Sequence, residues 1–200
     1  MPDARPRRIT VAITGASGSV YGLELLRALR SLGGVESHLV ISRAGLLTIR
    51  SETDMTRRDV EALADHVHSD KNVGATLASG SFQTSAMIVA PCSMKTLGCI
   101  AHGVGDSLIT RSADVVLKER RRLVLVARET PLNLAHLRNM VSVTEMGGIV
   151  YPPVPAFYSR PTDIASVVRE TVGRVMSLCG LDNGLFDEWS GLGTPQAQSQ

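Results

Sequence analysis

The sequence predicts one α/β domain in which helices flank a parallel sheet, and three observations lead to this prediction. Short β-branched runs alternate with stretches of helical periodicity along nearly the whole chain. Loops of small residues follow three of the predicted strands. The 200 residues, 44% of them hydrophobic, suffice for one sizeable core but not for two ordinary domains. Strands joined by helical crossovers pair in parallel, so we expect a parallel sheet.

The first half of the chain alternates between strands and helices. A strand over 8–14 ends in a glycine turn, and Val20, Leu23, Leu26 and Leu29 at helical spacing predict the helix that follows. The other elements predicted in this half are a strand over 35–41, helices over 44–50 and 57–66, and a strand over 86–91.

The second half continues the alternation. It predicts helices over 95–102 and 108–119, a strand over 123–127, a helix over 132–140, a short strand over 148–151 and a last helix over 163–179. Prolines at 152, 153 and 155 end the short strand. We expect a flexible N-terminus at 1–7, a single domain over 8–190 and a disordered polar tail at 191–200.

Composition excludes several classes of protein. The formal net charge is only +2 and the basic residues are dispersed, so charge does not indicate nucleic-acid binding. The apolar run at 9–13 is too short for a signal sequence or a membrane span. Three cysteines without a C-x-x-C pair favour neither a disulfide scaffold nor a zinc site, and fit a reducing cytoplasm. Apart from His66 and His68, in a polar stretch, no histidine pair has ligand spacing, and we expect no metal.

Candidate binding residues follow the predicted strands, at the edge where open α/β sheets bind ligands. The first loop is Gly15-Ala16-Ser17-Gly18, the second is 91–96 with Ser93 and Lys95, and Ser42 follows the strand between them in the sequence. Hydroxyls and amides at helix starts suit an anion, but each loop alone also fits an ordinary tight turn or helix cap. The pattern therefore leaves binding and capping open.

Charged residues directly after the predicted strand at 123–127 add a possible phosphate ligand and a possible proton carrier to this edge of the sheet. An arginine such as Arg128 can hold a phosphate through a bidentate fork, and the adjacent Glu129 can move a proton. Lys118 precedes the turn before that strand, on a largely apolar helix. We interpret 120–122, three consecutive arginines, as a solvated turn.

From the first strand to about Trp189, the chain resembles the UbiX family of flavin prenyltransferases. Seven segments carry the resemblance: T-G-A-S-G (14–18), L-V-I-S-R-A (39–44), A-S-G-S-F (78–82), P-C-S-M-K-T-L (91–97), R-S-A-D-V-V-L-K-E (111–119), L-V-L-V-A-R-E-T-P-L (123–132) and P-A-F-Y (155–158). The resemblance implies a flavodoxin-like Rossmann fold and a homo-oligomer, a dodecamer, with flavin sites at subunit interfaces.

The resemblance also implies the residues of the site. Those expected to hold FMN are Gly15, Ala16, Ser17, Ser42, Ser93, Met94, Lys95, Thr96 and Arg128. Those expected around dimethylallyl phosphate are Lys118, Arg128, Glu129, Tyr158, Arg174, Arg111 and Glu52, with Tyr158 and Arg174 coming from a neighbouring subunit. The catalytic residues expected are Glu129 for proton transfer, Lys118 at the phosphate, and Ser17 near the flavin N5.

The implied reaction transfers the dimethylallyl group from its phosphate to N5 and then C6 of reduced FMN, without a metal. The product would be the cofactor of a UbiD-type decarboxylase, with the pathway left open. Some family members carry a tryptophan shortly before the segment at 78–82. This chain has N-V-G-A-T-L at 72–77 and no tryptophan there, so packing around the prenyl chain is expected to differ.

Two other functions compete with prenyl transfer. One is a non-catalytic FMN-carrying subunit of an aromatic (hydroxyarylic) acid decarboxylase complex. The other is a flavin-dependent cysteine decarboxylase, which is disfavoured because no histidine lies between Gly18 and Gly34, where that group is expected to carry one.

Overall fold

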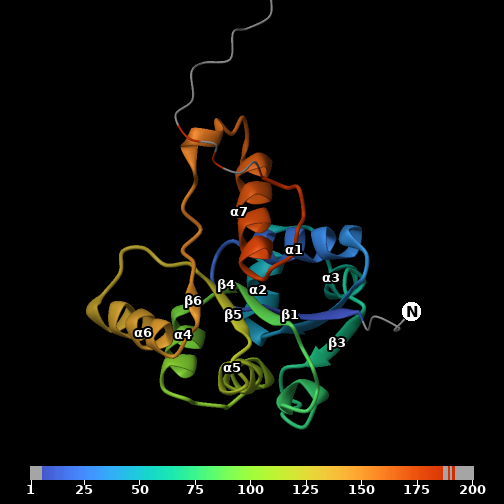
Figure 1. Ribbon diagram of the computed structural model, residues 1–200, viewed down its shortest axis with the longest axis vertical. Helices are drawn as coiled ribbons and strands as arrows, with labels where there is room; N and C mark the ends of the chain where they lie inside the picture. The colour runs from blue at the N-terminus through green and yellow to red at the C-terminus, as the bar shows by residue number, and fades with distance from the viewer. Residues whose placement is uncertain (1–5, 187–188, 190, 192–200) are drawn as a thin grey trace, which may run out of the picture.

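A computed structural model describes residues 6–186, 189 and 191. In this part of the chain six strands form one sheet, in the order β3-β2-β1-β4-β5-β6 (Figure 1). The strands are β1 (Arg7–Ile13), β2 (Val35–Ile41), β3 (His66–Ser69), β4 (Ala86–Cys92), β5 (Arg122–Ala127) and β6 (Ile149–Val150). All neighbours pair in parallel, which confirms the predicted sheet.

This strand order is the doubly wound order of Rossmann folds. Leaving out the short edge strand β3 gives the flavodoxin-like order 2-1-3-4-5, so the predicted fold class is confirmed. The chain winds outward from β1 in one direction through β2 and β3, and from β4 in the other through β5 and β6. The order therefore reverses between β1 and β4, at the centre of the sheet.

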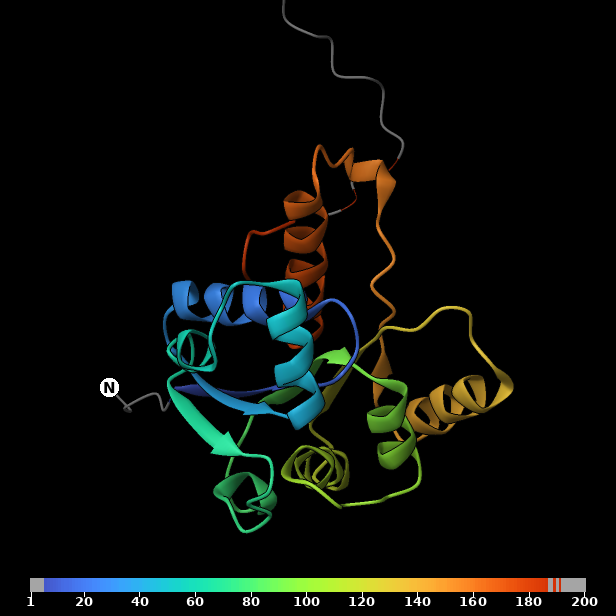
Figure 2. The same ribbon diagram turned by 180° about the vertical axis from the view of Figure 1, so that it is seen from behind.

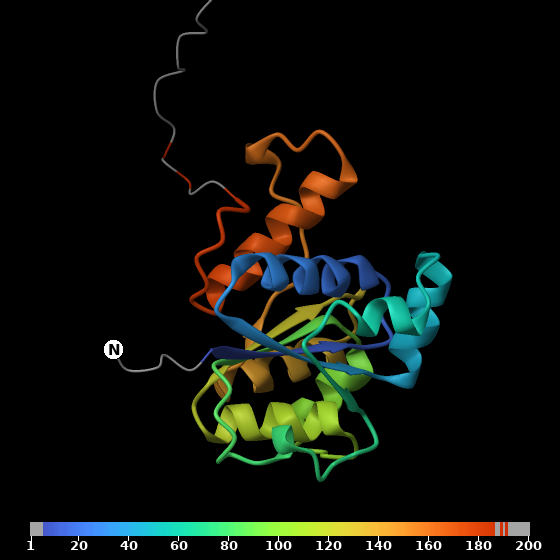
Figure 3. The same ribbon diagram turned by 90° about the vertical axis from the view of Figure 1, so that its right-hand side faces the viewer.

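Helices cover both faces of the sheet (Figure 3). They are α1 (Ser19–Leu32), α2 (Arg43–Glu52), α3 (Arg57–Glu61), α4 (Met94–Ala101), α5 (Leu108–Lys118), α6 (Leu134–Glu145) and α7 (Ile164–Leu178). Helices α1 and α7 pack together over one face, where they share a core with β1. Helices α4 and α5 cover the other face and form a second core with β4, and α6 lies outside α4.

The helix predicted over 57–66 is wrong in its second half. Helix α3 ends at Glu61, and His66–Ser69 forms β3, the edge strand beside β2. A four-residue strand that is mostly exposed has no apolar alternation to reveal it, so H-V-H-S appears in the sequence as a polar stretch.

The interpretation of 120–122 as a solvated turn holds for Arg120, which is exposed in a turn, and is wrong for Arg121. The Arg121 side chain is only 11% exposed, and its guanidinium donates to the carbonyl oxygens of Gly80 at 2.6 Å and Phe82 at 2.9 Å. Arg122 donates to the Leu178 carbonyl at the end of α7, 2.8 Å away. Through such contacts an arginine side chain holds a segment that is distant from it in the sequence. A local sequence pattern cannot reveal these contacts.

An extended arm connects β6 to α7 and projects away from the sheet (Figures 1 and 2). It contains the 3₁₀ turn η2 (Phe157–Ser159). Four large apolar side chains on it and at the start of α7 are more than half exposed: Val154, Phe157, Tyr158 and Ile164. A projecting segment with this composition is typical of an interface with another chain.

Helix α1 lies unusually close to the sheet because it carries a glycine at the point of contact. A Cβ on Gly22 would lie 2.3 Å from the Ala90 carbonyl oxygen and 2.9 Å from Ile13 Cγ1. We expect Gly22→Ala to destabilise the protein by about 2 kcal/mol, because helix and sheet must separate. The melting temperature should fall by roughly 4–8 °C.

Gly105→Ala is the matched control for this prediction. The nearest atom to a Cβ on Gly105 is 4.0 Å away, so this variant should melt within about 1–2 °C of the parent. Equal melting temperatures for the two variants would show that close packing at Gly22 does not limit stability.

Candidate functional site

The central feature is a cleft at the carboxyl ends of the strands, beside the point where strand order reverses. Open α/β sheets bind ligands at this position. The cleft has a volume of about 340 Å³, and five predicted residues line it: Gly15, Ser42, Ser93, Lys95 and Thr96. Asp70, Ser107 and Thr110 also line it and were not predicted, because no motif marks them in the sequence. Arg43, which follows Ser42 in the segment 39–44, lines it as well.

Close contacts fix the loop after β1. A Cβ on Gly15 would lie 2.4 Å from the Cβ of Ala44, so glycine allows the loop to lie directly on α2. Gly18 has a φ of 101°, a left-handed conformation that favours glycine. Between them, Ser17 is exposed and Ala16 is half-buried, so both are accessible to a ligand at the carboxyl ends of the strands.

Thr14 couples this loop to the one after β4, a role that the sequence did not reveal. Its buried hydroxyl donates to the Pro91 carbonyl and accepts from the Ser93 amide, both at 2.8 Å. The two loops are therefore held in fixed relation by one side chain. Below them, burial raises the pKa of the Cys92 thiol to about 12, so this cysteine packs without reacting at neutral pH.

Glu52 anchors the start of α1. Its carboxylate accepts from the Gly18 amide at 3.0 Å, the Ser19 amide at 2.8 Å and the Ser19 hydroxyl at 2.7 Å. Partial burial alone would raise the pKa of Glu52, but hydrogen bonds from Ser19, Ser17 and these amides outweigh it and hold the pKa below its ordinary value. The helix end that could attract an anion is thus occupied by a carboxylate of the protein itself.

We expect Glu52→Gln to weaken FMN binding about 10-fold, because a neutral amide holds the Ser17 loop less firmly. The folded-state pKa is lowered, so the carboxylate's contribution is complete above the ordinary glutamate pKa and is lost as pH falls through the folded value. FMN titrations from neutral to acidic pH should therefore show an acid step in the parent that the variant lacks. Glu24→Gln, farther along α1, is the control and should behave as the parent.

Serines cap the helices on the other two loops. The Ser42 hydroxyl accepts from the Gly45 amide at 3.0 Å, and the Ser93 hydroxyl accepts from the Thr96 amide at 3.3 Å. The capping interpretation is thus confirmed for both, and both still line the cleft. Lys95 lines it as well and forms no ion pair with any residue that the structure describes, so its charge is available to an anion. Met94 instead packs against the second core.

Arg128 and Glu129 lie at the same edge of the sheet. The Arg128 amide donates to the Cys92 carbonyl at 3.2 Å, which places Arg128 directly after β5 and next to the β4 loop. Burial raises the pKa of Tyr21, and the nearby Arg128 charge counteracts part of that rise. The Glu129 side chain is exposed and accepts from the Thr130 amide at 3.0 Å.

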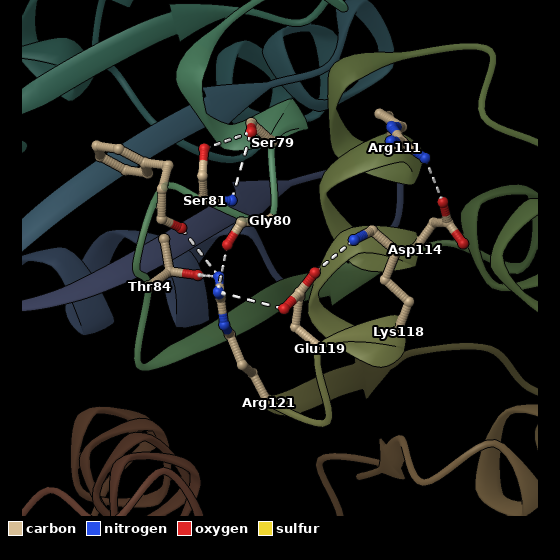
Figure 4. A network of polar contacts seen from close by, with 10 residues as sticks. Ser79, Gly80, Ser81, Thr84, Arg111, Asp114, Lys118, Glu119 and Arg121 are labelled. Carbon is tan, nitrogen blue, oxygen red and sulfur yellow. Dashed lines mark hydrogen bonds and ion pairs between the residues drawn. The ribbon is translucent and has the colours of Figure 1, made fainter.

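Lys118 is not brought to this edge within one chain, whereas Arg111 directly follows Thr110, which lines the cleft. Both lie on α5, which starts at the cleft and runs back along the sheet, so Lys118 is near the amino end of β5 (Figure 4). The six residues of β5, about 20 Å of strand, separate it from Arg128. Lys118 pairs with Glu119, and Arg111 pairs with Asp114.

Tyr158 and Arg174 form a third group, on the arm and on α7. Tyr158 is 56% exposed and its ring contacts Trp189 edge-on, with 5.1 Å between ring centroids. The Arg174 guanidinium lies 4.9 Å from the centre of the Phe186 ring. One chain therefore presents the predicted residues in separate places, and Lys118, Tyr158 and Arg174 do not line the cleft.

No helix among residues 6–186 is long and apolar enough to cross a membrane.

Comparison with known proteins agrees with this geometry. A family model described as Flavoprotein matches residues 2–176. The chain is 55% identical over 186 residues to the flavin prenyltransferase UbiX of Neisseria meningitidis serogroup B, a match that covers 93% of this chain and 98% of that protein.

Two solved structures have the same fold. The crystal structure of AnUbiX (PadA1) in complex with FMN and dimethylallyl pyrophosphate matches with a TM-score of 0.92 and 53% identity, covering 94% of this chain and all of that one. A dodecameric FMN-dependent UbiX-like decarboxylase from Escherichia coli O157:H7 matches with a TM-score of 0.89 and 48% identity, covering 92% of this chain and all of that one.

Proposed function

This chain belongs to the flavoprotein family and, within it, to the UbiX flavin prenyltransferases, and from that premise we propose the reaction that it catalyses. It is a transferase that moves a dimethylallyl group from dimethylallyl phosphate to N5 and C6 of reduced FMN, yielding prenylated FMN. The cleft at the sheet reversal carries this proposal, because five residues expected to hold FMN line it together.

The residues fit FMN in size, polarity and charge. Loop amides and the hydroxyls of Ser42, Ser93 and Thr96 offer hydrogen bonds to ribityl and phosphate oxygens. The Lys95 ammonium offers a counter-charge for the phosphate. Reduced FMN, when bound, supplies the nucleophilic N5 and C6 atoms. Ser17, exposed on the first loop, is the hydroxyl that we place near N5.

Breaking the allylic carbon–oxygen bond requires neutralisation of the phosphate that leaves. Lys118, Arg128 and Arg174 supply positive charge, and the Tyr158 hydroxyl supplies a hydrogen bond. Arg111 and Glu52 complete the set of residues that we place around this substrate. Closing the new ring at C6 then needs a proton moved, for which Glu129 is the residue we propose.

These groups can act together only across subunit contacts. Lys118 is separated from Arg128 by the length of β5, and Tyr158 lies on the exposed apolar arm. We therefore include a homo-oligomer in the proposal, a dodecamer as in the E. coli O157:H7 structure. Each site would take Tyr158 and Arg174 from a neighbouring chain, and Lys118 would likewise come from a chain other than the one that supplies Arg128.

The proposal extends to the place of the enzyme in the cell. Residues 8–190 would act as one flavoprotein domain, in the cytoplasm, and its product would pass to a UbiD-type decarboxylase as that enzyme's cofactor. Neither nucleic acid nor membrane takes part.

The test is anaerobic incubation of the purified protein with reduced FMN and dimethylallyl phosphate, followed by the mass and absorbance of the flavin. A flavin heavier by one dimethylallyl unit is expected. An unchanged flavin, with FMN binding confirmed and the diphosphate donor also tried, would overturn the proposal and favour a non-catalytic FMN-carrying subunit of a decarboxylase complex.

A further inference from the structure

Four titratable side chains gather on one face of the sheet at its β3 edge. Glu36 and His38 are on β2, His66 and His68 are on β3, and His38 pairs with His66 in the strand register. Because side chains alternate with a period of two, all four point to the same face. The rings of His66 and His68 lie 4.7 and 5.3 Å from that of His38, centroid to centroid.

Three of these side chains bring potential metal ligands close together. Glu36 Oε1 lies 2.8 Å from His38 Nε2 and 3.7 Å from His66 Nε2, and all three atoms lie within 4.8 Å of one another. Tetrahedral coordination at 2.0–2.1 Å places ligand atoms about 3.4 Å apart. The separations from Glu36 are within about 0.6 Å of that value. The His38 and His66 rings are stacked 19° from parallel, so the half-exposed His66 ring must turn before its nitrogen faces the same ion as His38.

The surroundings suit metal-bound histidine. The other ring nitrogen of His38, Nδ1, lies 3.0 Å from His68 Nε2. A metal on His38 Nε2 would put the proton on Nδ1, which would donate it to His68, and metal-bound imidazoles are characteristically held by such a bond. His38 is buried, whereas the His66 side chain is 53% exposed, so the ion could enter from the sheet edge.

We propose that Glu36, His38 and His66 bind one divalent transition-metal ion of the Zn²⁺ class. Two imidazoles and one carboxylate select such ions over Mg²⁺ and Ca²⁺, which prefer oxygen ligands. The site lies toward the amino ends of β2 and β3, whereas the flavin cleft lies at the carboxyl ends. It is therefore independent of prenyl transfer.

One neighbouring charge opposes the ion. Arg8 Nε donates to the same Glu36 oxygen at 2.9 Å, and its guanidinium lies 4.5 Å from the centre of the Phe82 ring. Metal binding must displace this contact. Removing the guanidinium should therefore strengthen metal binding, whereas a general loss of structure would weaken it. Arg8→Met should thus raise the metal affinity, and a variant that lacks a metal ligand should lower it.

The experiment titrates tag-free, chelator-treated protein with Co²⁺ and follows its visible absorption, with Zn²⁺ as competitor. We expect one Co²⁺ per chain, at least 10-fold weaker binding in His66→Gln, and tighter binding in Arg8→Met. His102→Gln is the control, because His102 contacts Asn139 on α6, and it should bind as the parent does.

Two results would overturn the proposal. One is the absence of stoichiometric Co²⁺ binding in the parent protein. The other is equal binding in the parent and in His66→Gln, with circular dichroism confirming that the variant is folded. If His66→Gln does not fold, Glu36→Gln replaces it, and unchanged binding in that variant has the same meaning.

Discussion

Lys118→Met should lower the rate of flavin prenylation by about 10²–10³-fold while FMN binds as in the parent. Lys118 is the cation that we place at the phosphate that leaves, and removing one preorganised group of this kind has an effect of that size. The FMN cleft lies at the far end of α5, so its affinity should stay within about two-fold. Single-turnover rates and FMN titrations measure the two quantities separately.

Lys71→Met is the control for this change. Lys71 is exposed and follows β3, so its removal alters surface charge by the same amount without touching the proposed phosphate site. Equal rates for Lys118→Met and the parent, at saturating substrate, would remove Lys118 from the catalytic set.

Subunit mixing would test where Lys118 acts. If Lys118 and Glu129 of one site come from different chains, oligomers assembled from Lys118→Met and Glu129→Gln subunits contain some sites with both residues intact. Formation of the ring-closed product should then recover on mixing two proteins that each form it slowly. If both residues of a site came from one chain, no mixed oligomer would contain an intact site and formation of that product would stay slow.

The fold was predictable wherever burial produces a pattern. The strands β1, β2, β4 and β5 are buried over most of their length, and each was predicted to within about two residues. Strand β3 was missed because it is short and mostly exposed, so its residues have no apolar period. Whether an element could be predicted depended more on the length of its continuous apolar run than on whether it was a helix or a strand.

The site was predictable only in part, for a different reason. Small residues and serines at strand ends mark the cleft, because glycine and hydroxyl groups are needed wherever backbone amides approach a ligand. Thr14 and Glu52 act through contacts with residues distant in the sequence, 79 residues away for the Ser93 amide. Arg121 was misread for the same reason, since only the fold brings Gly80 to it.

Glu129→Gln should separate the two bonds that the reaction forms. The transfer to N5 breaks the carbon–oxygen bond of the donor and the N5–H bond of the reduced flavin, and the departing phosphate can take that proton. Ring closure forms a carbon–carbon bond at C6, with loss of the C6 proton and addition of a proton to the prenyl alkene. Only the second step requires a group that gives and takes a proton, so removing the Glu129 carboxyl should slow ring closure by about 10²–10⁴-fold.

The readout compares the mass of the flavin with its absorbance over time. In the variant the mass should rise by one dimethylallyl unit, while the absorbance of the ring-closed product develops much more slowly than in the parent. Glu145→Gln, an exposed change at the end of α6, is the control and should leave both signals together. If mass and absorbance still change together in Glu129→Gln at the parental rate, another group moves the proton, and Glu129 is not a catalytic residue.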